Sequence, residues 1–370
     1  MSSLTARSEK KSFGLESRAE RRVGDVTKKA ALLTAAFCLC VLVCGAGDDE
    51  DRRVDRATDK ALEYLARTQN PDGSWPSNQY HKNSGVASLV VMAFMAKGHI
   101  PGEGRYGELI DKGIDYVLST CDPRTGCIAA TGGSSHGPMY SHGTSTLMLA
   151  QAVGMTSGER EKKIRTALEK AVKLILKAQK VRRSRPAEQG GWRYQPMSAD
   201  SDISVTGWQL MGLRAAKNAG ADVPAAAIND AVAYIKRSAS KGGGFGYRPG
   251  GPSNRARAGT GVLALEICGR HHEPEAVEGA EWLLKNPPKW PDEFFYYGVY
   301  YCSQGMFQMG GKYWQFYRPR LEALLLSLQG TDGSFPNCTS ADGRAGVVYA
   351  TSMASLALSV KYHYLPIYQR

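Results

Sequence analysis

The feature that most constrains the fold is a short motif that recurs along the chain. In each clear copy, a helical stretch with an apolar face ends in a Gln, a turn containing Gly follows, and the turn closes on one large aromatic residue. A recurrence of this kind is typical of repeat architectures rather than of a single irregular core. The three clearest pairs are Gln69 and Trp75, Gln179 and Trp192, and Gln329 and Phe335.

Weaker copies fill the gaps between the clear ones. They lie at residues 113–128, 231–245 and 280–290, where an apolar helical stretch again runs into Gly or Pro and then an apolar or aromatic residue. Six units therefore follow one another at intervals of roughly 45 to 65 residues. The sequence predicts an all-α solenoid closed on itself, because β-type alternation is nearly absent and the 41 Gly fall largely at helix ends.

The chemistry of one unit favours a structural role for its Gln and aromatic residues. Leu62, Tyr64 and Leu65 form an apolar stripe at helical spacing, and the Asp-Gly pair after them tolerates positive φ. The amide of Gln69 can bond backbone groups that lack partners at a helix end. Trp75 then packs between neighbouring units, where cutting it to Ala would cost about 3 to 5 kcal/mol.

The sequence Q-x-x-D-G-S-W at residues 69–75 resembles the QW repeat of the terpenoid cyclase and protein prenyltransferase superfamily. The resemblance covers residues 54–370 and implies an (α/α)6 toroid of six helical hairpins. Residues 190–196, 202–209 and 365–370 more narrowly resemble bacterial prenyltransferase and squalene oxidase repeat proteins, many of them from planctomycetes.

The first 46 residues have the composition of an export signal. Eight Lys and Arg precede an apolar run of about 17 residues that ends in small residues near Ala46, and acidic residues follow at 48–51. We expect a signal peptide at 1–46, an acidic linker at 47–53, and an exported protein of the periplasm or envelope. An uncleaved membrane anchor or a lipoprotein remains open, since the run is just long enough to span a bilayer.

Charge and cysteine content restrict the partners. The net charge is +12, and residues 1–46 supply about +4 of it, so the mature domain keeps roughly +8. Basic residues do not cluster with aromatic ones, so we expect no nucleic-acid binding, and membrane contact only through the N-terminal segment. Five Cys remain in the domain, of which Cys121 and Cys127 bracket one turn and could form a disulfide.

A second helix, poor in charge and rich in small residues, follows each motif. These six helices are expected to line the central axis, with their N-terminal ends at one mouth of the toroid. Aromatic residues and acids gather there, a combination suited to protonating an alkene and stabilising the resulting cation. The candidate residues of this mouth are His81, His142, Asp200, Asp202, Arg255, Arg257, Tyr296, Tyr297, Tyr300 and Tyr349.

The candidate acid is Asp202, with Asp200 second. The segment Asp200-Ser-Asp202-Ile203 resembles the D-x-D-D acid motif of squalene and other class II terpene cyclases, but Ile203 stands at the fourth position. The competing interpretation makes Asp202 the N-cap of a helix that starts near Ile203. The zinc site of protein prenyltransferases has no counterpart, because Cys302 lacks the expected Asp and His partners, and we expect neither a metal nor a cofactor.

Two hypotheses of function remain open. The first is an exported squalene or terpenoid cyclase-like enzyme, an isomerase or lyase that acts on an isoprenoid with Asp202 as the acid. The second is a catalytically silent toroid of the cell envelope whose mouth binds an isoprenoid or other apolar ligand, a peptide or an envelope protein. Because a fold does not determine a function, only the residues of the mouth can distinguish the enzyme from the binding module.

Overall fold

The computed structural model describes residues 49–129, 137–338 and 341–369, and divides the chain into two units. The first comprises residues 1–56, of which 49–56 are described and helical. The second comprises residues 57–370 and carries everything that follows. The predicted signal peptide at 1–46 lies outside the described residues, and of the predicted linker at 47–53, residues 49–53 are helical. No described helix is long and apolar enough to cross a bilayer.

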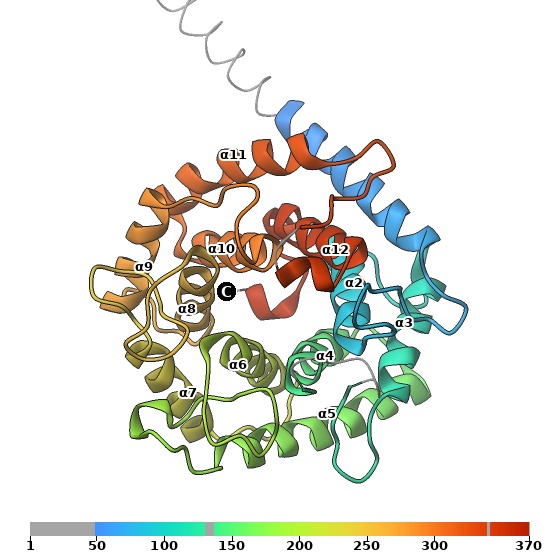
Figure 1. Cartoon of the computed structure of the whole chain (residues 1–370). Coiled ribbons are helices and arrows are strands. Elements are labelled where there is room, and N and C mark those ends of the chain that lie inside the picture. The colour runs from blue at the N-terminus through green and yellow to red at the C-terminus, as the bar shows by residue number, and fades with distance from the viewer. Residues whose placement is uncertain (1–48, 130–136, 339–340, 370) are drawn as a thin grey trace, which may run out of the picture. The chain divides into compact units, whose positions relative to one another are not determined.

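The second unit is a ring of outer helices around a ring of inner helices (Figure 1). The inner helices are α2 (Ser84–Ala96), α4 (Met139–Ala152), α6 (Ile203–Asn218), α8 (Arg255–Ile267), α10 (Phe295–Met309) and α12 (Val347–Leu358). The outer helices are residues 57–67, α3 (Gly107–Ser119), α5 (Gly158–Gln179), α7 (Ala225–Arg237), α9 (Pro274–Lys285) and α11 (Gly311–Leu328). Within the described ranges, β-structure is limited to isolated bridges, and short 3-10 turns occur in the connections and near the C-terminus.

The two kinds of helix differ in sequence as their positions require. Outer helices such as α5 bury one face and expose Lys and Glu on the other, whereas α2 is buried along its whole length. Small residues let the inner helices approach closely. A Cβ on Gly259 of α8, for example, would lie 2.6 Å from the backbone nitrogen of Cys302 in α10. The inner ring is therefore the core of the unit.

The ring closes on itself. Each inner helix packs against the next, and α12 at the end of the chain packs against α2 at its beginning. In the outer ring, the amide of Gln329 after α11 donates a hydrogen bond to the carbonyl of Ala57, 2.8 Å away. The prediction of an all-α toroid is thereby confirmed.

The repeated Gln and Trp residues join neighbouring outer helices. The Gln179 amide donates to the carbonyl of Gly190 in its own turn, at 2.9 Å, and to that of Ala227 in α7, at 2.8 Å. The indole N–H of Trp192 donates to the Ile175 carbonyl at 2.8 Å, and the side chain is 1% exposed. Gln69 and Trp75 make the same kinds of bond, and Phe335 is equally buried. These bonds hold each turn to its own outer helix and to the next outer helix.

The turn glycine of the motif is expected to tolerate no side chain. Gly190 has φ +92°, and a Cβ there would lie 2.3 Å from the carbonyl oxygen of Asp230 in α7. Gly190→Ala should therefore destabilise the unit by roughly 2 to 4 kcal/mol in denaturant unfolding. Gly220→Ala is the matched control, because Gly220 has φ +91° with no atom within 4 Å of such a Cβ, and should lose only about 1 to 2 kcal/mol. Equal losses would contradict close packing at the turn.

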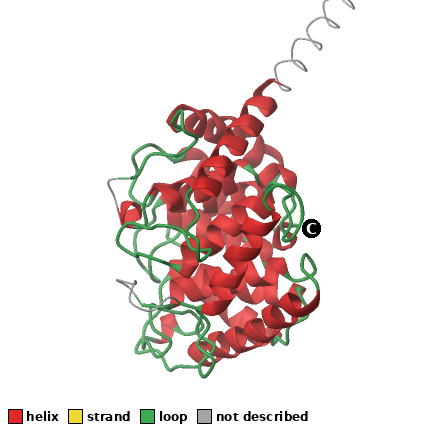
Figure 2. Ribbon diagram, turned by 90° about the vertical axis from the view of Figure 1, so that its right-hand side faces the viewer, coloured by secondary structure: helices red, strands yellow, loops and turns green. Residues whose placement is uncertain are grey.

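Most of the long connections gather at one end of the unit (Figure 2). They lead from the outer helices into the N-terminal ends of the inner helices. The C-terminal segment, with short 3-10 turns at Val360–Tyr362 and Pro366–Tyr368, lies inside the ring. Irregular loops over a rigid scaffold are a common setting for a binding site.

Candidate functional site

A cavity of about 440 Å³ opens where the N-terminal ends of the inner helices meet. Its size lies in the range of pockets that hold small molecules. Residues from the start of all six inner helices line it, together with residues of the loops before them. The aromatic lining residues are Tyr80, Tyr140, Tyr194, Trp208, Tyr247, Phe294, Tyr297 and Tyr349. The predicted mouth of the toroid therefore contains a real cavity.

Trp208 is the lining residue held by the most extensive aromatic packing. Its ring stacks on Tyr300 at 5.5 Å between centroids and meets Tyr301 edge-on at 5.1 Å. Tyr297, next to them on α10, also lines the cavity, and its hydroxyl lies 2.7 Å from the Thr260 hydroxyl. Aromatic pairs of this geometry stabilise each other beyond simple burial, so the wall is preorganised.

A buried carboxyl group, Asp342, also lines the cavity. It lies in the short 3-10 turn Ala341–Arg344, and its side chain reaches the N-terminal end of α10. Oδ2 accepts hydrogen bonds from the backbone N–H groups of Tyr296, at 2.8 Å, and Tyr297, at 3.3 Å. Among the described residues, no cation forms an ion pair with Asp342, and burial raises its pKa to about 6. Because Oδ2 takes both backbone bonds, Oδ1 is the oxygen suited to carry a proton.

Asp202 is in a different environment. It is fully buried at the N-cap of α6, where Oδ1 accepts from the N–H groups of Ser204 and Val205, both at 2.9 Å. Oδ2 forms an ion pair with Arg193 Nη1 at 2.9 Å. Burial raises the pKa of Asp202 to about 6, although the helix N–H groups and Arg193 oppose the shift. Both oxygens are engaged, and Asp202 is not among the cavity-lining residues.

Asp200 belongs to a network of ion pairs at the edge of the cavity. It forms ion pairs with Arg193 Nε at 3.2 Å and with Arg248 Nη2 at 2.6 Å. Arg193 also lies over the Tyr194 ring, 4.0 Å from its centroid, and donates to the Tyr247 hydroxyl. Since Tyr194 and Tyr247 both line the cavity, the network positions two walls of the site.

The structure separates the other predicted site residues into two groups. Arg257, Tyr297 and Tyr349 line the cavity, as the sequence predicts. The remaining predicted residues lie outside its lining: His81, His142, Arg255, Tyr296 and Tyr300.

His142 shows why a buried histidine need not be functional. Its Nδ1 accepts from the Ile128 N–H at 3.1 Å, and its Nε2–H donates to the Ala171 carbonyl at 3.2 Å. Burial lowers the pKa of His142 to about 4, so the ring stays neutral at physiological pH. The ring of His142 in α4 thus connects the turn at Ile128 to α5, and both of its nitrogens are engaged.

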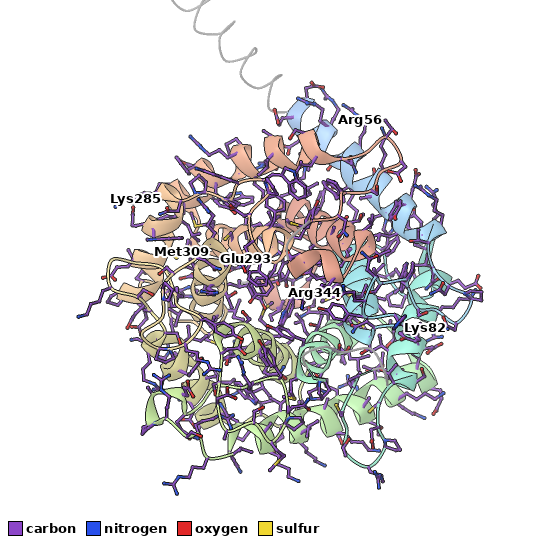
Figure 3. All side chains as sticks on the ribbon, viewed as in Figure 1. Arg56, Lys82, Lys285, Glu293, Met309 and Arg344 are labelled. Atoms are coloured by element: carbon purple, nitrogen blue, oxygen red, sulfur yellow. The ribbon has the colours of Figure 1, made fainter. Side chains whose placement is uncertain are left out.

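Sequence reasoning missed several lining residues. Asp342 precedes α12 but reaches α10, a contact between segments that no local pattern reveals. Glu293 and Arg344 carry opposite charges at the mouth and lie near the centre of the ring, whereas Lys285 lies on its outer side (Figure 3). Asn83 and Asn254, which cap α2 and α8, also line the cavity and could have been recognised as N-caps.

The pKa of Asp342 predicts a pH-dependent cost to stability. The pKa of Asp342 is 3.8 in the unfolded chain and about 6 in the folded one, so folding disfavours the charged carboxylate. The carboxyl group costs no stability below pH 3.8, where it is protonated in both states, and lowers the free energy of unfolding by about 3 kcal/mol above pH 6. Asp342→Asn keeps an acceptor for both N–H groups and removes this cost. Relative to wild type, it should therefore gain about 3 kcal/mol in unfolding free energy between pH 4 and pH 7. A pH-independent difference in urea unfolding would contradict this.

The arrangement of metal-ligating side chains can be examined over the part of the chain that the structure describes. Among the described residues, no three His, Cys, Asp or Glu side chains are grouped so that they could hold a metal ion. The described cysteines, including Cys121 and Cys127, are free thiols. What the site offers is aromatic surface, one buried carboxyl group and a charged rim.

Comparison with solved structures places the fold among toroids of diverse activity. The alpha-1,6-mannanase of Salegentibacter sp. HEL1_6 is similar over 84% of this chain and 99% of its own, with a TM-score of 0.61 and 9% identity. A type II terpene cyclase variant from Scytonema, in complex with geranylgeranyl dihydroxybenzoate, is similar over 86% of this chain and 99% of its own, with a TM-score of 0.55 and 13% identity. A D-mannose isomerase covers 84% of this chain and 97% of its own, with a TM-score of 0.58 and 13% identity. At such identities, the likeness concerns the fold alone.

The sequence itself identifies the family. No curated protein sequence matches the chain. The family model described as the prenyltransferase alpha-alpha toroid domain matches residues 4–184 and 173–289, which is more than half of the chain. The chain therefore belongs to the prenyltransferase alpha-alpha toroid domain family.

Proposed function

We propose that the cavity binds an isoprenoid and that Asp342 protonates one of its alkenes, as in a terpenoid cyclase. The observation that carries the proposal is the combination of eight aromatic lining residues with one buried carboxyl group that has no cation partner among the described residues. The Scytonema protein of the same fold is a type II terpene cyclase, which supports an apolar, unsaturated ligand.

The chemistry follows from the surroundings of Asp342. A general acid must be protonated in the working site, and a pKa of about 6 leaves part of the population protonated near neutral pH. An apolar ligand that displaces water from the cavity would raise this pKa further, because the charged form loses solvation. The cation formed on the ligand would meet the faces of Trp208, Tyr297 and Tyr349, each worth up to about 2 kcal/mol by cation–π attraction.

The alternative is a binding module without catalysis. Its support is that Asp342 already has a structural task, since its Oδ2 accepts from two N–H groups at the start of α10. A cap of this kind contributes about 1 kcal/mol and needs no reaction to explain it. In this case the same aromatic cavity would hold an apolar ligand that leaves unchanged.

The test has a binding arm and a turnover arm. Lipids that co-purify with the protein are identified by mass spectrometry, and the purified protein is then incubated with geranylgeraniol and with squalene. Binding with a cyclised product supports the enzyme, and binding without any product supports the module. Ser141→Trp is the control, because it fills the cavity from its wall and should abolish binding in both cases. Failure of all these polyprenes to bind the intact protein would refute the isoprenoid proposal.

We also propose that the protein is exported. The support is the sequence of residues 1–46, a basic segment followed by an apolar run and small residues. Protein recovered from its host should begin near Gly47 and lie outside the cytoplasm. An intact N-terminus in the membrane fraction would indicate an anchor, and an intact N-terminus on cytoplasmic protein would refute export.

A further inference from the structure

The C-terminal segment lies at the end of the inner ring opposite the cavity, where the inner helices end. The backbone N–H of Ile367 donates to Gln151 Oε1 at 3.1 Å, in the last turn of α4. The Gln308 amide, in the last turn of α10, donates to the carbonyl of Tyr368 at 3.0 Å. Since α4 and α10 are opposite members of the inner ring, the segment spans the central axis.

The segment is buried as firmly as the core. Leu365, Ile367 and Tyr368 are 3%, 7% and 5% exposed, although they belong to the last few residues of the chain. The turn Pro366–Tyr368 packs against α6, the helix that carries Trp208. Burial and hydrogen bonding of this kind give the segment a definite place in the fold.

A column of three aromatic side chains joins the segment to the cavity. Trp208 lines the cavity and stacks on Tyr300 with an interplanar angle of 13°. The Tyr300 hydroxyl lies 2.5 Å from that of Tyr368, and both side chains are buried. Trp208 is five residues into α6, so this floor lies roughly 8 Å below the mouth end of the helix.

We propose that the C-terminal segment 365–369 is a plug that supports Trp208 as the floor of the cavity and thereby limits the length of the polyprenyl chain that binds. The inference rests on the proposed isoprenoid ligand. It assigns the length limit to Trp208, Tyr300 and Tyr368, and predicts that loss of the plug opens the cavity toward the far end of the ring.

The test compares all-trans prenols with the same head group and different lengths: farnesol, geranylgeraniol and geranylfarnesol. Their dissociation constants are measured by equilibrium dialysis with the full chain, with Tyr368→Ala and with a chain that ends at Tyr364. In wild type and in each variant, we compare the affinity for geranylfarnesol with the affinity for farnesol. We expect this ratio to be about tenfold or more higher in both variants than in wild type, which corresponds to burial of two further methylene groups. Tyr368→Phe is the matched control, because it removes the hydroxyl contact and keeps the ring, and its length preference should match that of wild type.

The outcomes separate the plug from the proposed function. If Tyr368→Ala binds the three prenols with the same length preference as wild type, the plug is overturned and the proposed ligand class stands. If the truncated chain does not fold, Tyr368→Ala alone tests the plug. If no prenol binds the intact protein, the proposed function fails and a crystal structure of Tyr368→Ala decides the plug. A cavity deepened past Trp208 would then support it, and a floor still closed by Trp208 and Tyr300 would overturn it.

Discussion

Asp342→Asn is expected to lower the turnover of a polyprene substrate by about 10²- to 10⁴-fold, the usual contribution of a positioned general acid. The amide cannot donate the acidic proton, but its oxygen can still accept from the N–H groups of Tyr296 and Tyr297. Ligand affinity and the fold should therefore be kept. Product is measured by gas chromatography and mass spectrometry, and affinity by equilibrium dialysis.

The pH dependence provides a second readout of the same residue. Because the pKa of Asp342 is about 6, turnover limited by its protonated form should fall as pH rises above this value. Glu293→Gln is a further test, since Glu293 is exposed at the mouth of the same cavity and its negative charge raises the pKa of Asp342. Without that charge, the fall in turnover should begin at a lower pH.

Asp202→Asn tests the acid that the sequence predicts. If Asp342 is the acid, Asp202→Asn should keep the cap of α6 through its amide oxygen, lose the charge of the ion pair with Arg193, and leave turnover largely unchanged. If Asp202→Asn instead removes turnover with the fold intact while Asp342→Asn keeps it, the proton donor is Asp202. The two variants together therefore show whether Asp342 or Asp202 is the proton donor.

The fold could be predicted because its signal is local and repeated. The Gln, the turn glycine and the aromatic residue of each unit lie close together in the sequence, and the side-chain hydrogen bonds of Gln179 and Trp192 stay within their own unit or reach the next outer helix. A repeat protein is stabilised by contacts between neighbouring units, so the structure inferred for one unit predicts the whole ring. The resemblance to the toroid superfamily depends on the same residues.

The site was only partly predictable because its lining combines helix residues with loop residues that meet from different parts of the ring. Arg257, Tyr297 and Tyr349 lie within the first turns of inner helices, and position in a helix sufficed to place them. Tyr296 and Tyr300 share α10 with Tyr297 but point elsewhere, toward the Pro336 carbonyl and the Tyr368 hydroxyl. Which face of a helix meets the cavity depends on packing that the sequence does not display.

The long connection between α5 and α6 shows a further limit of sequence reasoning. It carries Arg193, Tyr194 and Asp202, and it is organised by Arg183, an ordinary basic residue in the sequence. In the structure Arg183 is 5% exposed and its guanidinium makes five hydrogen bonds, all to protein oxygen atoms. The acceptors are the Ser201 hydroxyl and the carbonyls of Ala178, Val181, Gly191 and Ser198.

Arg183→Met should cost about 3 to 5 kcal/mol of unfolding free energy, because it leaves several buried oxygen atoms without a donor. The loop should also lose its shape, so that Tyr194 no longer forms the cavity wall and ligand binding weakens. Arg182→Met is the matched control, since Arg182 is exposed and should change stability by no more than about 0.5 kcal/mol. Urea unfolding of both variants measures the difference. Equal stability would mean that the loop is held by its other contacts, the bridge between Trp192 and Asp202 and the Arg193 network.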